Sequence, residues 1–108
     1  MSRLQSVTFV AVCVLLGVQL HAGAQHIVVQ KNKAFSVTTL TVKVGDSVVF
    51  SNNDDITHNV FSLSKGLEFN TKAQAPGTAN QVTWKTDGIV EVNCAFHPKM
   101  KLIITVKK

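Results

Sequence analysis

Apolar and polar residues alternate over short stretches of this chain, a pattern that favours β-strands over helices. The alternation is clearest at residues 40–44, which read Leu-Thr-Val-Lys-Val, and almost no helical periodicity follows residue 24. Several short strands separated by turn residues are typical of an antiparallel sandwich or barrel, so the sequence predicts an all-β domain. The expected strands span residues 26–30, 40–44, 47–51, 58–63, 81–85, 88–93 and 102–107.

Paired glycine and aspartate mark two of the expected turns. Gly45-Asp46 joins two expected strands and Asp87-Gly88 joins two others, so we expect a β-hairpin at each position. Residues 64–80 are the least regular part of the chain, and we expect a long loop there with one short helical turn.

The first 24 residues have the pattern of a secretory signal peptide. Arg3 supplies a basic start, residues 7–20 are nearly all apolar, and Ala22-Gly23-Ala24 forms a small-residue cleavage site. The apolar run is short for a membrane span, which needs about 20 residues. We therefore expect export, most simply to a bacterial periplasm, with a single domain at residues 25–108 and no permanent membrane span.

The charge of the chain is positive. The formal net charge is +5, and Arg3 is the only arginine. Because the lysines are scattered along an exported chain, we expect acidic protein partners rather than nucleic acid.

The use of cysteine indicates a metal. Cys13 would leave with the signal peptide, so the exported chain keeps Cys94 alone. Secreted domains normally use cysteines in pairs, and a single thiolate in an oxidising compartment needs an occupant. The alternation over residues 88–94 also places Cys94 on the inward face of its strand, at the mouth of the core.

Three candidate metal ligands follow one another at intervals of three residues. Cys94, His97 and Met100 lie in a segment that we expect to be one loop between two strands, and His58 lies upstream at the edge of another strand. Each residue alone is weak evidence, because a lone cysteine is more often a small buried apolar residue. Together, one thiolate, two imidazoles and a thioether are the ligands of a blue-copper electron-transfer site.

The sequence resembles the cupredoxins of the plastocyanin and amicyanin type over essentially all of residues 25–108. The resemblance is carried by Val-Gly-Asp-x-Val-x-Phe at 44–50, His-Asn-Val at 58–60 and Cys-Ala-Phe-His-Pro-Lys-Met at 94–100. It implies a Greek-key β-sandwich that binds one copper ion of type 1 and passes electrons without catalysing a reaction. The copper ligands that it implies are His58, Cys94, His97 and Met100.

The resemblance also assigns residues around the ligands. Asn59 would tie the two ligand segments together and hydrogen-bond near the thiolate. Because His97 is expected at the tip of its loop, it would be the ligand that faces solvent, at the centre of a docking surface for a redox partner such as an acidic c-type cytochrome or oxidoreductase. We expect a monomer whose docking residues are Phe96, Pro98, Lys99 and Lys101. Asn93 stands where plastocyanins have an aromatic residue, which removes the basis for a second electron route.

Other functions remain open at this point. A copper carrier or buffer would use the same ligands without a redox partner. Zinc bound by Cys94, His58 and His97 would resemble an open catalytic site, against which Met100 argues. A thiol enzyme lacks a visible oxyanion-hole motif. Attached haem is disfavoured because Cys-Ala-Phe-His lacks the second cysteine of a haem-attachment sequence.

Overall fold

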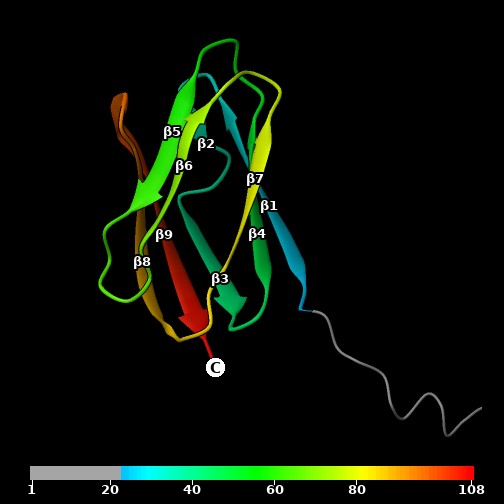
Figure 1. The fold of residues 1–108 in the computed structure, drawn as a ribbon, viewed down its shortest axis with the longest axis vertical. Coiled ribbons are helices and arrows are strands. Elements are labelled where there is room, and N and C mark those ends of the chain that lie inside the picture. The colour runs from blue at the N-terminus through cyan, green and yellow to red at the C-terminus, as the bar shows by residue number, and fades with distance from the viewer. Residues whose placement is uncertain (1–22) are drawn as a thin grey trace, which may run out of the picture.

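The computed structural model describes residues 23–108, and these residues form two β-sheets packed face to face (Figure 1). One sheet has four strands in the order β2-β1-β4-β7, and the other has five in the order β3-β9-β8-β5-β6. The strands are β1 (Gln25–Lys31), β2 (Ala34–Phe35), β3 (Thr39–Lys43), β4 (Ser47–Asn52), β5 (His58–Ser62), β6 (Phe69–Gln74), β7 (Ala79–Thr83), β8 (Gly88–Cys94) and β9 (His97–Lys107). Within this part of the chain no helix is long and apolar enough to cross a membrane.

The predicted all-β sandwich is confirmed, but its sheets are mixed and not purely antiparallel. β1 runs parallel to β4, with Val28 opposite Phe50, and β3 runs parallel to β9, with Val42 opposite Val106. Strand alternation reports only which side chains face the core, so it cannot show the direction of a neighbouring strand. The predicted signal peptide lies outside the described residues as far as residue 22.

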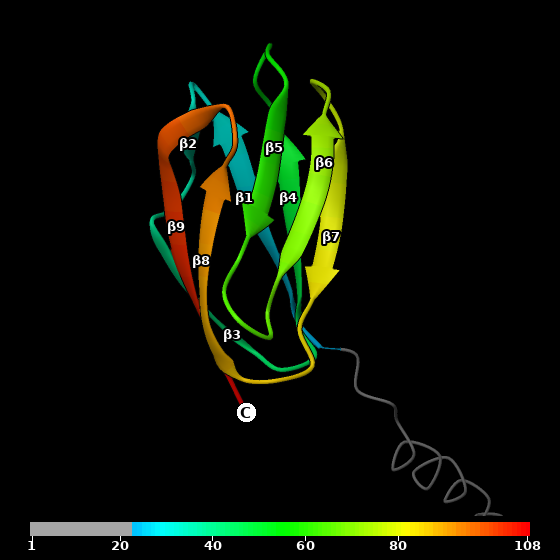
Figure 2. The same ribbon diagram turned by 60° about the vertical axis from the view of Figure 1, so that its left-hand side comes forward.

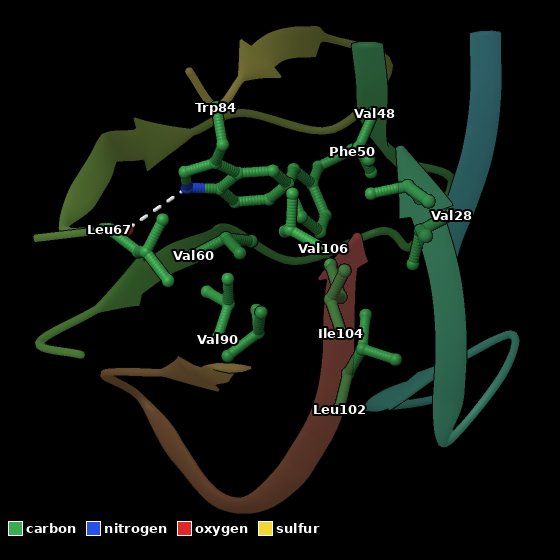
Figure 3. Close-up of a cluster of buried hydrophobic side chains, with 12 residues drawn as sticks. Val28, Val48, Phe50, Val60, Leu67, Trp84, Val90, Leu102, Ile104 and Val106 are labelled. Carbon is green, nitrogen blue, oxygen red and sulfur yellow. Dashed lines mark hydrogen bonds between the residues drawn. The ribbon is translucent and has the colours of Figure 1, made fainter. Parts of the chain in front are cut away.

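The core is built from the inward side chains of both sheets, as Figure 3 shows. Phe50 is fully buried and stacks on Phe69, with ring centroids 5.4 Å apart. Phe69 in turn meets the edge of Trp84, whose indole N–H donates to the carbonyl of Leu67 at 3.0 Å. Full burial of an apolar side chain contributes about 1.5–3 kcal/mol, so this core supplies the main stabilisation of the domain.

Neither predicted hairpin forms. Gly45-Asp46 lies between β3 and β4, and Asp87-Gly88 leads into the first residue of β8, but β3 and β4 belong to different sheets, as do β7 and β8. Each connection therefore crosses from one sheet to the other. The prediction was wrong because two strands that face one core from opposite sides show the same alternation as two paired strands.

The prediction of a long loop over residues 64–80 is also wrong. This stretch holds β6 and the start of β7, and it contains no helical turn. β6 is an edge strand with mostly polar side chains, and Lys72 interrupts it with a φ of 64°. A polar and irregular edge strand leaves no alternation in the sequence, which explains why it was missed.

The strand phase around the candidate ligands is confirmed. Val90, Val92 and Cys94 are all buried, whereas Ile89 and Glu91 on the opposite face are exposed. Figure 2 shows that the turn between β8 and β9 and the start of β5 lie at the end of the sandwich opposite the C-terminus. The candidate ligands therefore gather at one pole of the domain.

Candidate metal centre

Three donor atoms converge at this pole. The sulfur of Cys94 lies 3.5 Å from Nδ1 of His58 and 3.7 Å from Nδ1 of His97. All three atoms lie within 4.8 Å of one another, and the two imidazole centroids are 4.9 Å apart. Two imidazole nitrogens and one sulfur are thus close enough together to bind a single metal ion.

A shift in strand register brings these atoms together. Asn93 pairs with Lys101, but the next residue of β8, Cys94, pairs with His97, so residues 98–100 of β9 have no partner on β8. Such irregularities redirect side chains at functional sites. The prediction that Cys94, His97 and Met100 share one loop is therefore wrong, because only residues 95–96 form the turn. Cys94 ends β8, and His97 and Met100 belong to β9.

The candidate ligands differ sharply in exposure. His58 is fully buried, and Cys94 and Met100 are each 2% exposed. His97 is only partly buried, and it follows the exposed residue Phe96 at the turn. The centre is therefore closed on the side of the core and approaches solvent through a single imidazole.

Sequence analysis did not identify Asp54, which contacts His58. Its Oδ2 lies 2.9 Å from Nε2 of His58, and its side chain is 8% exposed. Hydrogen bonds from the backbone N–H of Lys33 and from His58 lower the pKa of Asp54 to about 2. A carboxylate can only accept, so Nε2 of His58 donates to Asp54, and Nδ1 is the ring nitrogen that faces the sulfur of Cys94.

A tight turn from the other sheet holds Asp54 in place. Lys31 pairs with Ala34, so Asn32 and Lys33 form a two-residue turn between β1 and β2, with φ values of 54° and 58°. Two successive positive φ values are the signature of a type I′ hairpin turn. The backbone N–H groups of both turn residues donate to Asp54, at 3.1 and 2.9 Å.

Asn52 fixes the backbone of the loop that carries Asp54. This side chain is fully buried, and its oxygen accepts from the backbone N–H of Asp54 at 2.9 Å. Its amide group donates to the carbonyl oxygens of Ile56 and Gln74, at 2.9 and 2.8 Å. A buried amide with three partners restricts the loop and so helps to fix the orientation of His58.

Asn59 connects the two ligand segments through its backbone. Its carbonyl oxygen accepts from the N–H of Ala95 at 3.0 Å, immediately after Cys94. The side-chain amide donates to Asn70 at 2.9 Å, and the hydrogen bonds of the Cys94 sulfur within residues 23–108 are those to His58 and His97. Asn59 therefore ties the two ligand segments together beside Cys94 through its backbone, whereas its side chain bonds to Asn70.

Replacing Asp54 with asparagine should weaken Cu(II) binding about 10- to 100-fold, the usual effect of losing the hydrogen-bonding partner of a ligating histidine. The change removes the negative charge and replaces one of the two accepting oxygens with an NH2 group, which cannot accept from the N–H donors of Asn32, Lys33 and His58. Competition with a calibrated Cu(II) chelator measures the effect. Asp55→Asn is the matched control, because Asp55 is the exposed neighbour of Asp54. Equal affinities for the two variants would show that the contact of Asp54 with His58 is incidental.

The partly exposed side of the centre opens into a shallow hollow of about 380 Å³. Its lining includes the predicted docking residues Phe96, Pro98 and Lys99, together with His97 and Lys33. The fourth predicted docking residue, Lys101, does not line the hollow, and its ammonium lies 3.7 Å from Glu91.

The donor set fits copper better than zinc. Soft thiolate and thioether ligands favour Cu(I), and imidazole suits copper in proteins generally. Structural zinc sites are closed by four cysteine or histidine ligands. Among residues 23–108 only three such residues gather here, His58, Cys94 and His97, and the fourth candidate ligand is the thioether of buried Met100.

Comparisons with known proteins agree with this chemistry. The family of copper binding proteins of the plastocyanin/azurin type matches residues 24–107. The methylamine utilization protein MauL of Methylorubrum extorquens is 34% identical over 64 residues, which are 58% of this chain and 56% of that protein. The chain therefore spans little more than half the length of this relative.

Solved structures show the same fold. The reduced Cu(I) form of a proline-to-glycine mutant of amicyanin has a TM-score of 0.71 and 25% identity, over 82% of this chain and 87% of that chain. A purple cupredoxin from Nitrosopumilus maritimus has a TM-score of 0.67 and 22% identity, over 76% of this chain and 99% of that chain. At the latter identity the likeness shows the fold alone.

Proposed function

This chain belongs to the plastocyanin/azurin family of copper-binding proteins, and from that membership we propose that it is an exported blue copper protein that passes single electrons between redox proteins. This function makes the chain an electron carrier rather than an enzyme, in keeping with a family of copper-binding proteins. The observation that carries the proposal is the buried sulfur of Cys94 beside Nδ1 of both His58 and His97.

The proposed ligands are His58, Cys94, His97 and Met100. Copper bound by them would supply one-electron chemistry between its +1 and +2 states. The buried strands β5 and β8 carry His58 and Cys94, so these two side chains have little freedom to move. A rigid ligand set keeps nearly one geometry in both oxidation states, which favours fast electron transfer.

The proposed route for electrons runs through His97. His97 is the least buried member of the set, and Phe96 beside it is 57% exposed. Phe96 and Pro98 provide an apolar contact surface, and Lys99 provides a positive charge at its edge, with Lys101 farther out. An apolar patch with charges at its rim suits a transient complex with an acidic partner.

Two measurements on the copper-loaded protein separate electron transfer from copper carriage. Electron transfer predicts a reversible one-electron voltammetric wave and copper that stays bound in the presence of a competing Cu(I) chelator. Rapid loss of copper to the chelator together with an irreversible wave would indicate a carrier or buffer instead.

Met100 is expected to tune the potential rather than to be required for binding, because a thioether is the weak axial ligand of such sites. Met100→Leu keeps the buried apolar volume and removes a donor that stabilises Cu(II). The variant should remain blue, with a reduction potential higher by on the order of 59 mV, which is a tenfold change in the redox equilibrium. Voltammetry measures the shift, and complete loss of copper binding would make Met100 a primary ligand.

Export is proposed from the leader sequence, with cleavage between Ala24 and Gln25. The mass of the protein produced with its own leader tests this, because a soluble product that starts at Met1 would contradict it.

A further inference from the structure

The hollow beside His97 is formed by both sheets. Phe96, Pro98 and Lys99 come from the β8–β9 connection and the start of β9, whereas Lys33 comes from the turn between β1 and β2. The two segments lie more than sixty residues apart in the sequence, and Figure 2 shows both turns at the same end of the sandwich. Lysines from the two sheets thus line one hollow.

The backbone of Lys33 is held firmly at this position. Its N–H donates to Asp54 at 2.9 Å, and Asp54 also contacts His58. The ammonium of the neighbouring Lys31 does not line the hollow and instead donates to the carbonyl of Asn53 at 3.2 Å. Of the lysines at this turn, Lys33 is therefore the one that lines the hollow.

Lys33 and Lys99 both have charges available to a partner. Each is exposed, and the ion pairs within residues 23–108 use only His26, His58 and Lys101 as cationic groups. Lys101 differs, because Glu91 lies 3.7 Å from its ammonium. Unpaired charges around an apolar contact mainly raise the rate of association with a surface of opposite sign.

We propose that Lys33 and Lys99 together form a basic docking site at His97 for an acidic redox protein, with Phe96 and Pro98 as its apolar contact. This inference rests on the proposed electron-transfer function and names the chemistry of the partner surface. In the docked complex one electron passes from the reduced copper protein to the oxidised partner, or in reverse. Lys33 takes the place that sequence analysis gave to Lys101.

The test compares charge reversals at three positions in the copper-loaded protein. Lys33→Glu and Lys99→Glu change the docking site, whereas Lys85→Glu makes the same change in net charge at an exposed position that lines a hollow with the C-terminal Lys108. Lys33→Glu keeps the backbone N–H that binds Asp54, so the visible spectrum and the melting temperature should stay unchanged. The rate measured is that of electron transfer to an oxidised acidic c-type cytochrome, with hexacyanoferrate(III) as a small reference oxidant.

We expect Lys33→Glu and Lys99→Glu each to slow the reaction with the cytochrome about tenfold at low ionic strength, within the range seen for association rates among interface mutants. The difference should shrink as salt rises, because the screening length falls from about 30 Å at 0.01 M to about 8 Å at 0.15 M. Lys85→Glu should have a much smaller effect.

Two results would overturn the inference alone. One is a Lys33→Glu rate equal to that of the wild type, and the other is an equal slowing by Lys85→Glu, which would reduce the effect to net charge. A wild-type protein that exchanges electrons with neither the cytochrome nor hexacyanoferrate(III) would overturn the proposed function and this inference with it.

Discussion

Replacing Cys94 with serine should abolish the intense blue absorption of the Cu(II) protein and most of its copper affinity. The absorption of such sites comes from charge transfer between thiolate and copper, and a hydroxyl group cannot supply it. The sulfur lies within 3.7 Å of an imidazole nitrogen of both His58 and His97, and Cys94 is 2% exposed. The loss of affinity should exceed the ~100-fold that is the upper range for losing only the hydrogen-bonding partner of a ligand.

Copper titration followed by visible absorption measures both effects of Cys94→Ser. Met100→Leu is the control, because it removes the other buried sulfur from the proposed ligand set and should stay blue. Circular dichroism of the metal-free protein should show the same strand content in both variants. A blue Cys94→Ser variant would exclude the proposed role of the thiolate.

Replacing Phe50 with alanine should destabilise the metal-free domain by about 3–5 kcal/mol, the usual effect of truncating a buried aromatic residue. Phe50 is fully buried and stacks on Phe69, which itself contacts Trp84. Because small domains have a total stability of about 5–15 kcal/mol, this loss would leave the domain marginally folded.

Urea unfolding of the metal-free protein measures the effect of Phe50→Ala. The matched control is Phe96→Ala, which removes the same atoms from a side chain that is 57% exposed and should change the stability by no more than about 0.5 kcal/mol. If the two variants were equally stable, the packing of Phe50 would not support the sandwich in the way described.

The inward faces of the strands could be predicted because alternation depends on burial alone. The alternation over residues 88–94 predicted that Cys94 faces inward, and Cys94 is buried together with Val90 and Val92 on the same face. The pairing of strands could not be predicted in the same way. β3 and β4 both alternate around Gly45-Asp46, yet they face the core from different sheets, so their alternation resembles that of a hairpin.

The residues that surround the ligands were harder to predict than the ligands. Cys94 and His97 are near in sequence, and their side-chain chemistry is distinctive. Asp54 looked like an ordinary loop residue, because its importance depends on contacts with His58 and with the distant turn at Asn32 and Lys33. That turn has two positive φ values without a glycine, so the usual sequence signal of a type I′ turn is absent.

The proposed function depends on a type 1 copper site formed by His58, Cys94, His97 and Met100. The most direct measurement is the visible absorption spectrum of the metal-free protein after addition of one equivalent of Cu(II) in the presence of an equal amount of Zn(II). We predict an intense blue absorption that reaches its full strength at one copper per chain. A colourless protein that retains zinc would contradict the claim.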